Sequence, residues 1–131
     1  MLILLLLATG FAVGQGLFLG LPDPTPKSDG WGLTLEAAQA ISPVLWVDAR
    51  AERMYEEEHL EGALHMSHDD FDNGLARLLE NWDPEMSIIV YCDGEACESS
   101  QALAAELREV LAEERVYWLI GGWEKLKGAS N

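Results

Sequence analysis

Positive charge and cysteine are both scarce in this sequence. The 131-residue chain carries 8 Lys and Arg against 23 Asp and Glu, which gives a formal net charge of −15 at pH 7. Such a surface repels nucleic acid and anionic lipid headgroups, so neither is an expected partner. The 2 cysteines are too few for a disulfide scaffold, and without a second Cys/His cluster they are also too few for a structural zinc site.

Charged residues of either sign are absent from the first 21 positions. About 20 apolar residues are enough to span a bilayer, so residues 1–21 predict a membrane anchor. A cleaved signal peptide is the alternative, since small residues precede Gln15, although the basic start of a signal peptide is missing. We prefer the anchor, and under either interpretation an extracytoplasmic location is favoured. Residues 22–30, rich in Pro and Asp, read as a linker, and the soluble domain is expected over 31–131.

Helical and strand patterns alternate along the soluble domain. Helices are expected at 34–40, capped by Thr34, and at 52–58, 71–82, 99–112 and 123–126, and strands at 44–47, 88–91 and 116–119. This alternation predicts an α/β domain with a parallel sheet and helices on both faces. In such sheets the ligand site lies at the carboxyl ends of the strands, which is where Asp48, Cys92 and Gly121 fall.

The most informative motif is a buried strand followed at once by Cys92, a short loop and a helix. Backbone N–H groups of the loop and the dipole of the following helix can both point at the sulfur. That geometry favours thiolate over thiol and predicts a reactive cysteine.

Further motifs occur in a characteristic order: Asp48-Ala49-Arg50, then Tyr55, then His59-Leu60-Glu61-Gly62-Ala63, then Tyr91-Cys92, then Leu119-Ile120-Gly121-Gly122-Trp123. In order and spacing they resemble the rhodanese-like domain family, from about Leu33 to Leu126. The resemblance implies a five-stranded parallel sheet flanked by helices. It also implies a sulfurtransferase in which Cys92 is the nucleophile, takes a sulfane sulfur as a persulfide and passes it to an acceptor.

The loop after the cysteine would then cradle the persulfide with its backbone N–H groups. Its residues are Asp93, Gly94, Glu95, Ala96, Cys97 and Glu98. The partners implied are a small sulfur donor and a thiol acceptor, or a protein that carries the persulfide or thiol. No cofactor is expected, and the soluble domain is expected to be monomeric.

The sequence departs from the family pattern within this loop. No Lys or Arg occurs between Arg77 and Arg108, where the family often has an arginine. The loop is one residue longer than the common sulfurtransferase form and closer to related phosphatases, but their arginine is absent, so phosphate chemistry is not expected. Cys97 is an unusual second thiol. It is either a resolving thiol able to attack a persulfide or disulfide at Cys92, or a buried small apolar residue.

The remaining candidates are interpreted as structural. Asp48 and Arg50 are expected to form a partly buried ion pair that holds the domain together. His59 is expected to support its turn rather than act as a base, and His65 and His68 are expected to be ordinary loop residues rather than metal ligands. A non-catalytic rhodanese-like module is the alternative function: it would bind a partner, or sense redox state by closing a Cys92–Cys97 disulfide.

Overall fold

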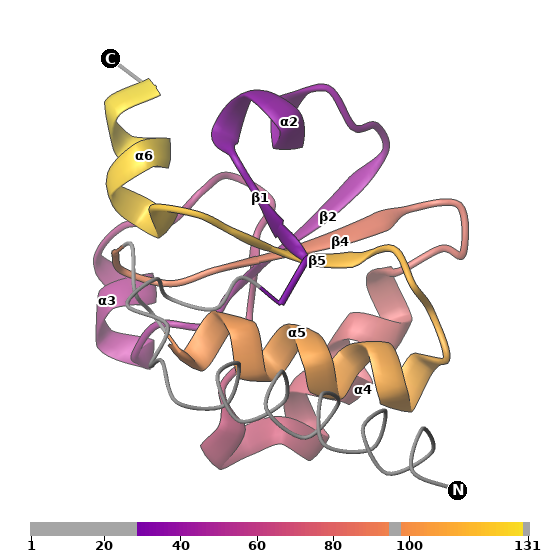
Figure 1. Cartoon of the computed structure of the whole chain (residues 1–131). Coiled ribbons are helices and arrows are strands. Elements are labelled where there is room, and N and C mark those ends of the chain that lie inside the picture. The colour runs from indigo at the N-terminus through magenta and orange to yellow at the C-terminus, as the bar shows by residue number, and fades with distance from the viewer. Residues whose placement is uncertain (1–28, 95–97, 130–131) are drawn as a thin grey trace, which may run out of the picture.

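The computed structural model describes residues 29–94 and 98–129, which form one parallel sheet with helices packed on its two faces (Figure 1). The expected anchor over 1–21 and most of the linker lie outside the described residues. Within the part of the chain that the structure describes, no helix is long and apolar enough to cross a membrane.

The elements alternate as the sequence predicts. The strands are β1 (Gly32–Leu33), β2 (Val44–Asp48), β3 (Leu64–His65), β4 (Ser87–Tyr91) and β5 (Val116–Leu119). The helices are α2 (Leu35–Gln39), α3 (Glu52–Glu57), α4 (Phe71–Asn81), α5 (Glu98–Leu111) and α6 (Gly122–Ala129), with a short 3-10 helix, η1 (His68–Asp70). The α/β class with five parallel strands is therefore confirmed. The short strands β1 and β3 have no counterpart among the strands expected from the hydrophobic pattern, and α6 is longer than expected.

The strand order places β4 at the centre of the sheet. The order is β1-β5-β4-β2-β3, and every neighbouring pair is parallel. All residues of β4 are buried, as is typical of a central strand covered on both faces. Because β2, β4 and β5 run in register, their carboxyl ends meet at one edge of the sheet.

Alternate residues of β4 face two separate cores, as strand geometry requires. Ile88 and Val90 pack in one core with Leu78 of α4 and Leu103 and Leu107 of α5. Ile89 and Tyr91 pack in the other core with Ala38 of α2 and Leu126 of α6. In Figure 1, α4 and α5 accordingly lie below the sheet, with α2 and α6 above it. The end of β4 is therefore packed on both faces of the sheet.

Candidate active site

Cys92 is the first residue after β4 and is only 7% exposed. The backbone on both sides of it is hydrogen-bonded. The N–H of Ala49 donates to the carbonyl of Tyr91 at 2.8 Å, and the N–H of Trp123 donates to the carbonyl of Cys92 itself at 2.6 Å. The segments that follow β2 and β5 therefore fix the point at which the strand turns into the loop.

The sulfur of Cys92 is in a disulfide bond. The only other cysteine of the chain, Cys97, lies outside the described residues, together with Glu95 and Ala96. Of the remaining loop residues, Asp93 is exposed, Gly94 is half-buried and Glu98 opens α5. The end of β4 and the first residue of α5 therefore flank the loop. That the loop cradles a persulfide stays a prediction.

Asp48 and Arg50 form a buried ion pair. Asp48 is fully buried and Arg50 is 4% exposed. The guanidinium Nη2 lies 2.8 Å from Asp48 Oδ2, and Nε lies 3.1 Å from both carboxylate oxygens. Burial works against the charge of Arg50, but the hydrogen bonds and negative charge of Asp48 outweigh it and raise the pKa of the guanidinium. The positive charge of Arg50 is therefore paired within the protein.

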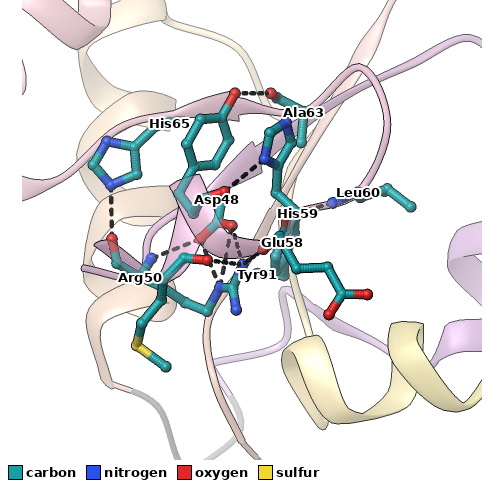
Figure 2. A network of polar contacts seen from close by, with 10 residues as sticks. Asp48, Arg50, Glu58, His59, Leu60, Ala63, His65 and Tyr91 are labelled. Carbon is teal, nitrogen blue, oxygen red and sulfur yellow. Dashed lines mark hydrogen bonds and ion pairs between the residues drawn. The ribbon is translucent and has the colours of Figure 1, made fainter. Parts of the chain in front are cut away.

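Further contacts of Arg50 extend into a polar network (Figure 2). Its Nη2 donates to the carbonyl of Glu58 at 2.6 Å, and its own carbonyl lies 2.7 Å from Nε2 of His65. His59 is exposed, stacks on Tyr55 with ring centroids 3.8 Å apart, and places Nδ1 2.7 Å from the Tyr55 carbonyl. These contacts connect the end of α3 to β3. The imidazoles of His59 and His65 each contact a backbone carbonyl, those of Tyr55 and Arg50.

A cavity of about 290 Å³ opens at the carboxyl edge of the sheet. Its lining includes Ala49, Arg50, His68, Asp69, Ser99 and Leu103. It adjoins a wider cavity of about 590 Å³, with which it shares Ala51, Ser67 and Asp69. The wider one is bordered by carboxylates from α3 and η1. The imidazole of His68 is half-exposed and lies 3.3 Å from Glu106 Oε2. The smaller cavity reaches the first turn of α5 at Ser99, while Cys92 is not among the lining residues of either cavity. The border of the wider cavity carries Arg77 as well as the four carboxylates.

Two contacts at this edge were not foreseen from the sequence. The phenol oxygen of Tyr91 accepts a hydrogen bond from the N–H of Leu60 at 3.2 Å. Burial, with a contribution from the nearby charge of Asp48, raises the pKa of Tyr91. The second is the backbone contact of Trp123 with Cys92. Its signal in the sequence was the Gly121-Gly122-Trp123 motif, which marked the family without indicating what the motif contacts.

Comparisons with known proteins agree with this geometry. A sequence model of the rhodanese-like domain matches residues 34–129. The chain is 39% identical over 98 residues to the thiosulfate sulfurtransferase GlpE of Coxiella burnetii in several strains, an alignment that covers 71% of this chain and 82% of the relative. Among solved structures, the BH2092 protein from Bacillus halodurans superposes with a TM-score of 0.60 at 24% identity, covering 77% of this chain and 74% of that chain. The similarity to BH2092 supports the fold alone.

Proposed function

Because the chain belongs to the rhodanese-like domain family, we propose that it is a sulfurtransferase whose nucleophile is Cys92. The similarity to a protein named as a thiosulfate sulfurtransferase supports the class of reaction. The observation that carries the assignment of the residue is the position of Cys92. It lies at the end of the central strand, with its backbone held by neighbouring segments, one short loop before α5.

The proposed reaction has two steps. The thiolate of Cys92 attacks the outer sulfur of a donor, so that a new S–S bond forms and the donor leaves with the electron pair of its broken sulfur–sulfur bond. An acceptor thiolate then attacks the outer sulfur of the persulfide, and Cys92 departs as the thiolate. The loop from Asp93 to Glu98, followed by the positive end of the α5 dipole, would stabilise the negative sulfur in both states.

The N-terminal segment suggests where the protein acts. Residues 1–21 carry no charge and are long enough to span a bilayer, so we propose that they tether the domain to a membrane. Membrane fractionation followed by carbonate extraction tests this. A chain released by carbonate at its full mass contradicts a membrane tether, and a chain shortened at its N-terminus supports export with cleavage.

Mass spectrometry tests the assignment of Cys92. The full chain is reduced, exposed to polysulfide or thiosulfate, and digested for peptide mapping. We expect the mass of one added sulfur on the peptide that contains Cys92, and its loss in Cys92→Ser. Cys97→Ser is the matched control, since it removes a thiol five positions away and keeps the proposed nucleophile. Added sulfur confined to Cys97, or to neither cysteine, would contradict the proposal.

The disulfide at Cys92 favours a second candidate function. In this alternative, a peroxide takes two electrons and two protons from the thiols of Cys92 and Cys97 and leaves as water or an alcohol, the two sulfurs join, and the domain reports redox state without transferring sulfur. Thiol counting after mild oxidation, with and without reductant, separates the two. A chain that forms the disulfide reversibly yet takes up no sulfur from any donor favours the redox module.

A further inference from the structure

The first turn of α6 contacts the backbone of the proposed nucleophile directly. The N–H of Trp123 donates to the Cys92 carbonyl at 2.6 Å, and the N–H of Glu124 points at the Asp93 carbonyl with an N···O distance of 3.4 Å. Both donors belong to the start of a helix, where N–H groups have no partner inside the helix. Two consecutive carbonyls of the Cys92 loop therefore satisfy two of the donors that α6 leaves open.

This approach requires glycine at position 122. Gly122 has φ +53°, and a Cβ atom placed there would lie 2.2 Å from the carbonyl oxygen of Cys92 and 2.9 Å from its carbonyl carbon. Neither atom belongs to a flexible side chain, so an alanine here would displace the loop or α6. The glycine thus permits a contact that any side chain would prevent.

The side chain of Trp123 also fixes the first turn of α6, through contacts with Arg50 and Tyr91. The Arg50 guanidinium carbon lies 4.5 Å from the centroid of the Trp123 ring, within the range of a cation–π contact. The ring also stacks on Tyr91, with centroids 5.9 Å apart. Since Arg50 is itself fixed by Asp48, the turn is anchored to the ends of both β2 and β4.

Peptide planarity connects these contacts to the loop. In a trans peptide the carbonyl of one residue and the N–H of the next lie in one plane and point in opposite directions. A fixed Cys92 carbonyl therefore fixes the direction of the Asp93 N–H. A fixed Asp93 carbonyl does the same for the N–H of Gly94. These two groups are the first donors of the loop that follows the sulfur.

We propose that Gly122 and Trp123 are positioning residues for Cys92: they orient the first two N–H groups of its loop through the carbonyls that α6 holds. The inference rests on the proposed function only in taking Cys92 as the reactive thiol. It assigns to residues about 30 positions downstream a part in setting the reactivity of the sulfur, beyond a part in stability.

Glycine-to-alanine variants test this, with two matched controls. Gly121 and Gly62 also have positive φ, +86° and +84°, so alanine strains the backbone at all three positions. The three atoms nearest to a Cβ at Gly121 all belong to the flexible side chain of Lys125, and a Cβ at Gly62 meets nothing within 4 Å. Strain is therefore shared by the three variants, while displacement of the Cys92 carbonyl is particular to Gly122→Ala.

The readout is the rate of alkylation of Cys92 by iodoacetamide as a function of pH, in the full chain carrying Cys97→Ser. Gly122→Ala is expected to slow alkylation at neutral pH by about 10- to 100-fold, because N–H groups that no longer face the sulfur leave less of the thiol ionised, and to move the midpoint of the pH profile upward. Gly121→Ala and Gly62→Ala are expected to lose stability and to keep the profile of the parent. A Gly122→Ala profile that matches the Gly62→Ala profile overturns the proposal.

Substitutions of Trp123 keep the test decisive if Gly122→Ala does not fold. Trp123→Phe retains an aromatic face for Arg50 and is expected to keep the parent profile, whereas Trp123→Ala is expected to shift it. Equal profiles for the two variants overturn the part assigned to the ring. Sulfur uptake is measured on the same samples. If the parent takes up no sulfur, sulfur transfer is refuted. If Gly122→Ala still changes the alkylation profile in that case, the positioning inference stands.

Discussion

Arg50 is the residue on which the polar contacts of the site converge. It binds the Asp48 carboxylate through two nitrogens, donates to the Glu58 carbonyl and contacts the ring of Trp123. A planar guanidinium suits this role, because its donors are arranged in a fixed fork and its face is free to lie on an aromatic ring. The charge of Arg50 is therefore engaged inside the protein, and its side chain is only 3% exposed.

Asp48→Asn is the first prediction at the scale of single residues. It keeps the shape of the side chain but leaves the buried Arg50 charge without its counterion. We expect the free energy of unfolding to fall by about 3–5 kcal/mol, the usual cost of removing one partner from a buried pair. Urea denaturation measures this.

A partly exposed pair provides the control for this prediction. Glu113 and Arg115 are joined by a 3.0 Å contact, with their side chains 19% and 44% exposed. Water screens such a pair, so Glu113→Gln should change stability far less. If the two variants lose equal stability, burial of the Asp48–Arg50 pair has no energetic consequence and the structural role assigned to it is wrong.

At the scale of elements, the helices were predictable because each carries local signals. Thr34 accepts a hydrogen bond from the N–H of Ala37, as its position before α2 predicts. α4 was recognised from Leu75, Leu78 and Leu79 at helical spacing, although Leu79 is 52% exposed. The central strands were predictable from continuous apolar runs.

Two kinds of feature were not predictable from the chain alone. Strands β1 and β3 have two residues each, too short for any periodic pattern to form. The contact between α6 and Cys92 depends on which strands become neighbours, since β5 pairs with β4 and so brings residue 122 to residue 92. Strand order is a long-range property, and no local signal near Cys92 or Trp123 contains it.

The loop between β4 and α5 gives a prediction about the donor. Asp93 is exposed beside Cys92, and the segment between Arg77 and Arg108 contains no Lys or Arg. Arg50 is near enough to interact with Asp93, but its charge is already paired with Asp48. We therefore expect a dianion such as thiosulfate to be a poorer donor than a neutral or protein-bound persulfide. Asp93→Lys should lower the KM for thiosulfate by about two- to fivefold, since exposed charges interact weakly.

Glu80→Lys is the matched control for the donor prediction. It makes the same change in net charge on an exposed residue of α4 and should leave the KM as it is in the parent. An equal fall in KM for both variants would mean that overall charge, rather than the loop, governs the donor. Efficient use of thiosulfate by the parent, with a low KM, would refute the expected preference.

For the whole molecule, stability should depend on pH in the alkaline range through Tyr91. Burial raises the pKa of this phenol above its ordinary value of 10.0. Above pH 10 the unfolded chain releases the proton while the folded chain retains it, so ionisation favours unfolding. The contribution of the neutral phenol is complete below pH 10 and declines as the pH rises toward the folded-state pKa.

Tyr91→Phe isolates this contribution. The stability of the parent relative to the variant should be constant up to about pH 9 and then fall by about 1.4 kcal/mol per pH unit above pH 10, the value for one proton. Denaturant titrations at several pH values measure the difference. Curves that stay parallel through pH 11 would show that the phenol ionises equally in the folded and unfolded chains.

The two shortest strands have a consequence for the molecule in a crowded solution. The outer strands of a sheet expose unpaired N–H and C=O groups, onto which a second chain can add a strand of its own. Here both edges are formed by β1 and β3, which offer only two residues each. Such short edges leave little template for β-aggregation, so copies of this domain can remain separate at high concentration.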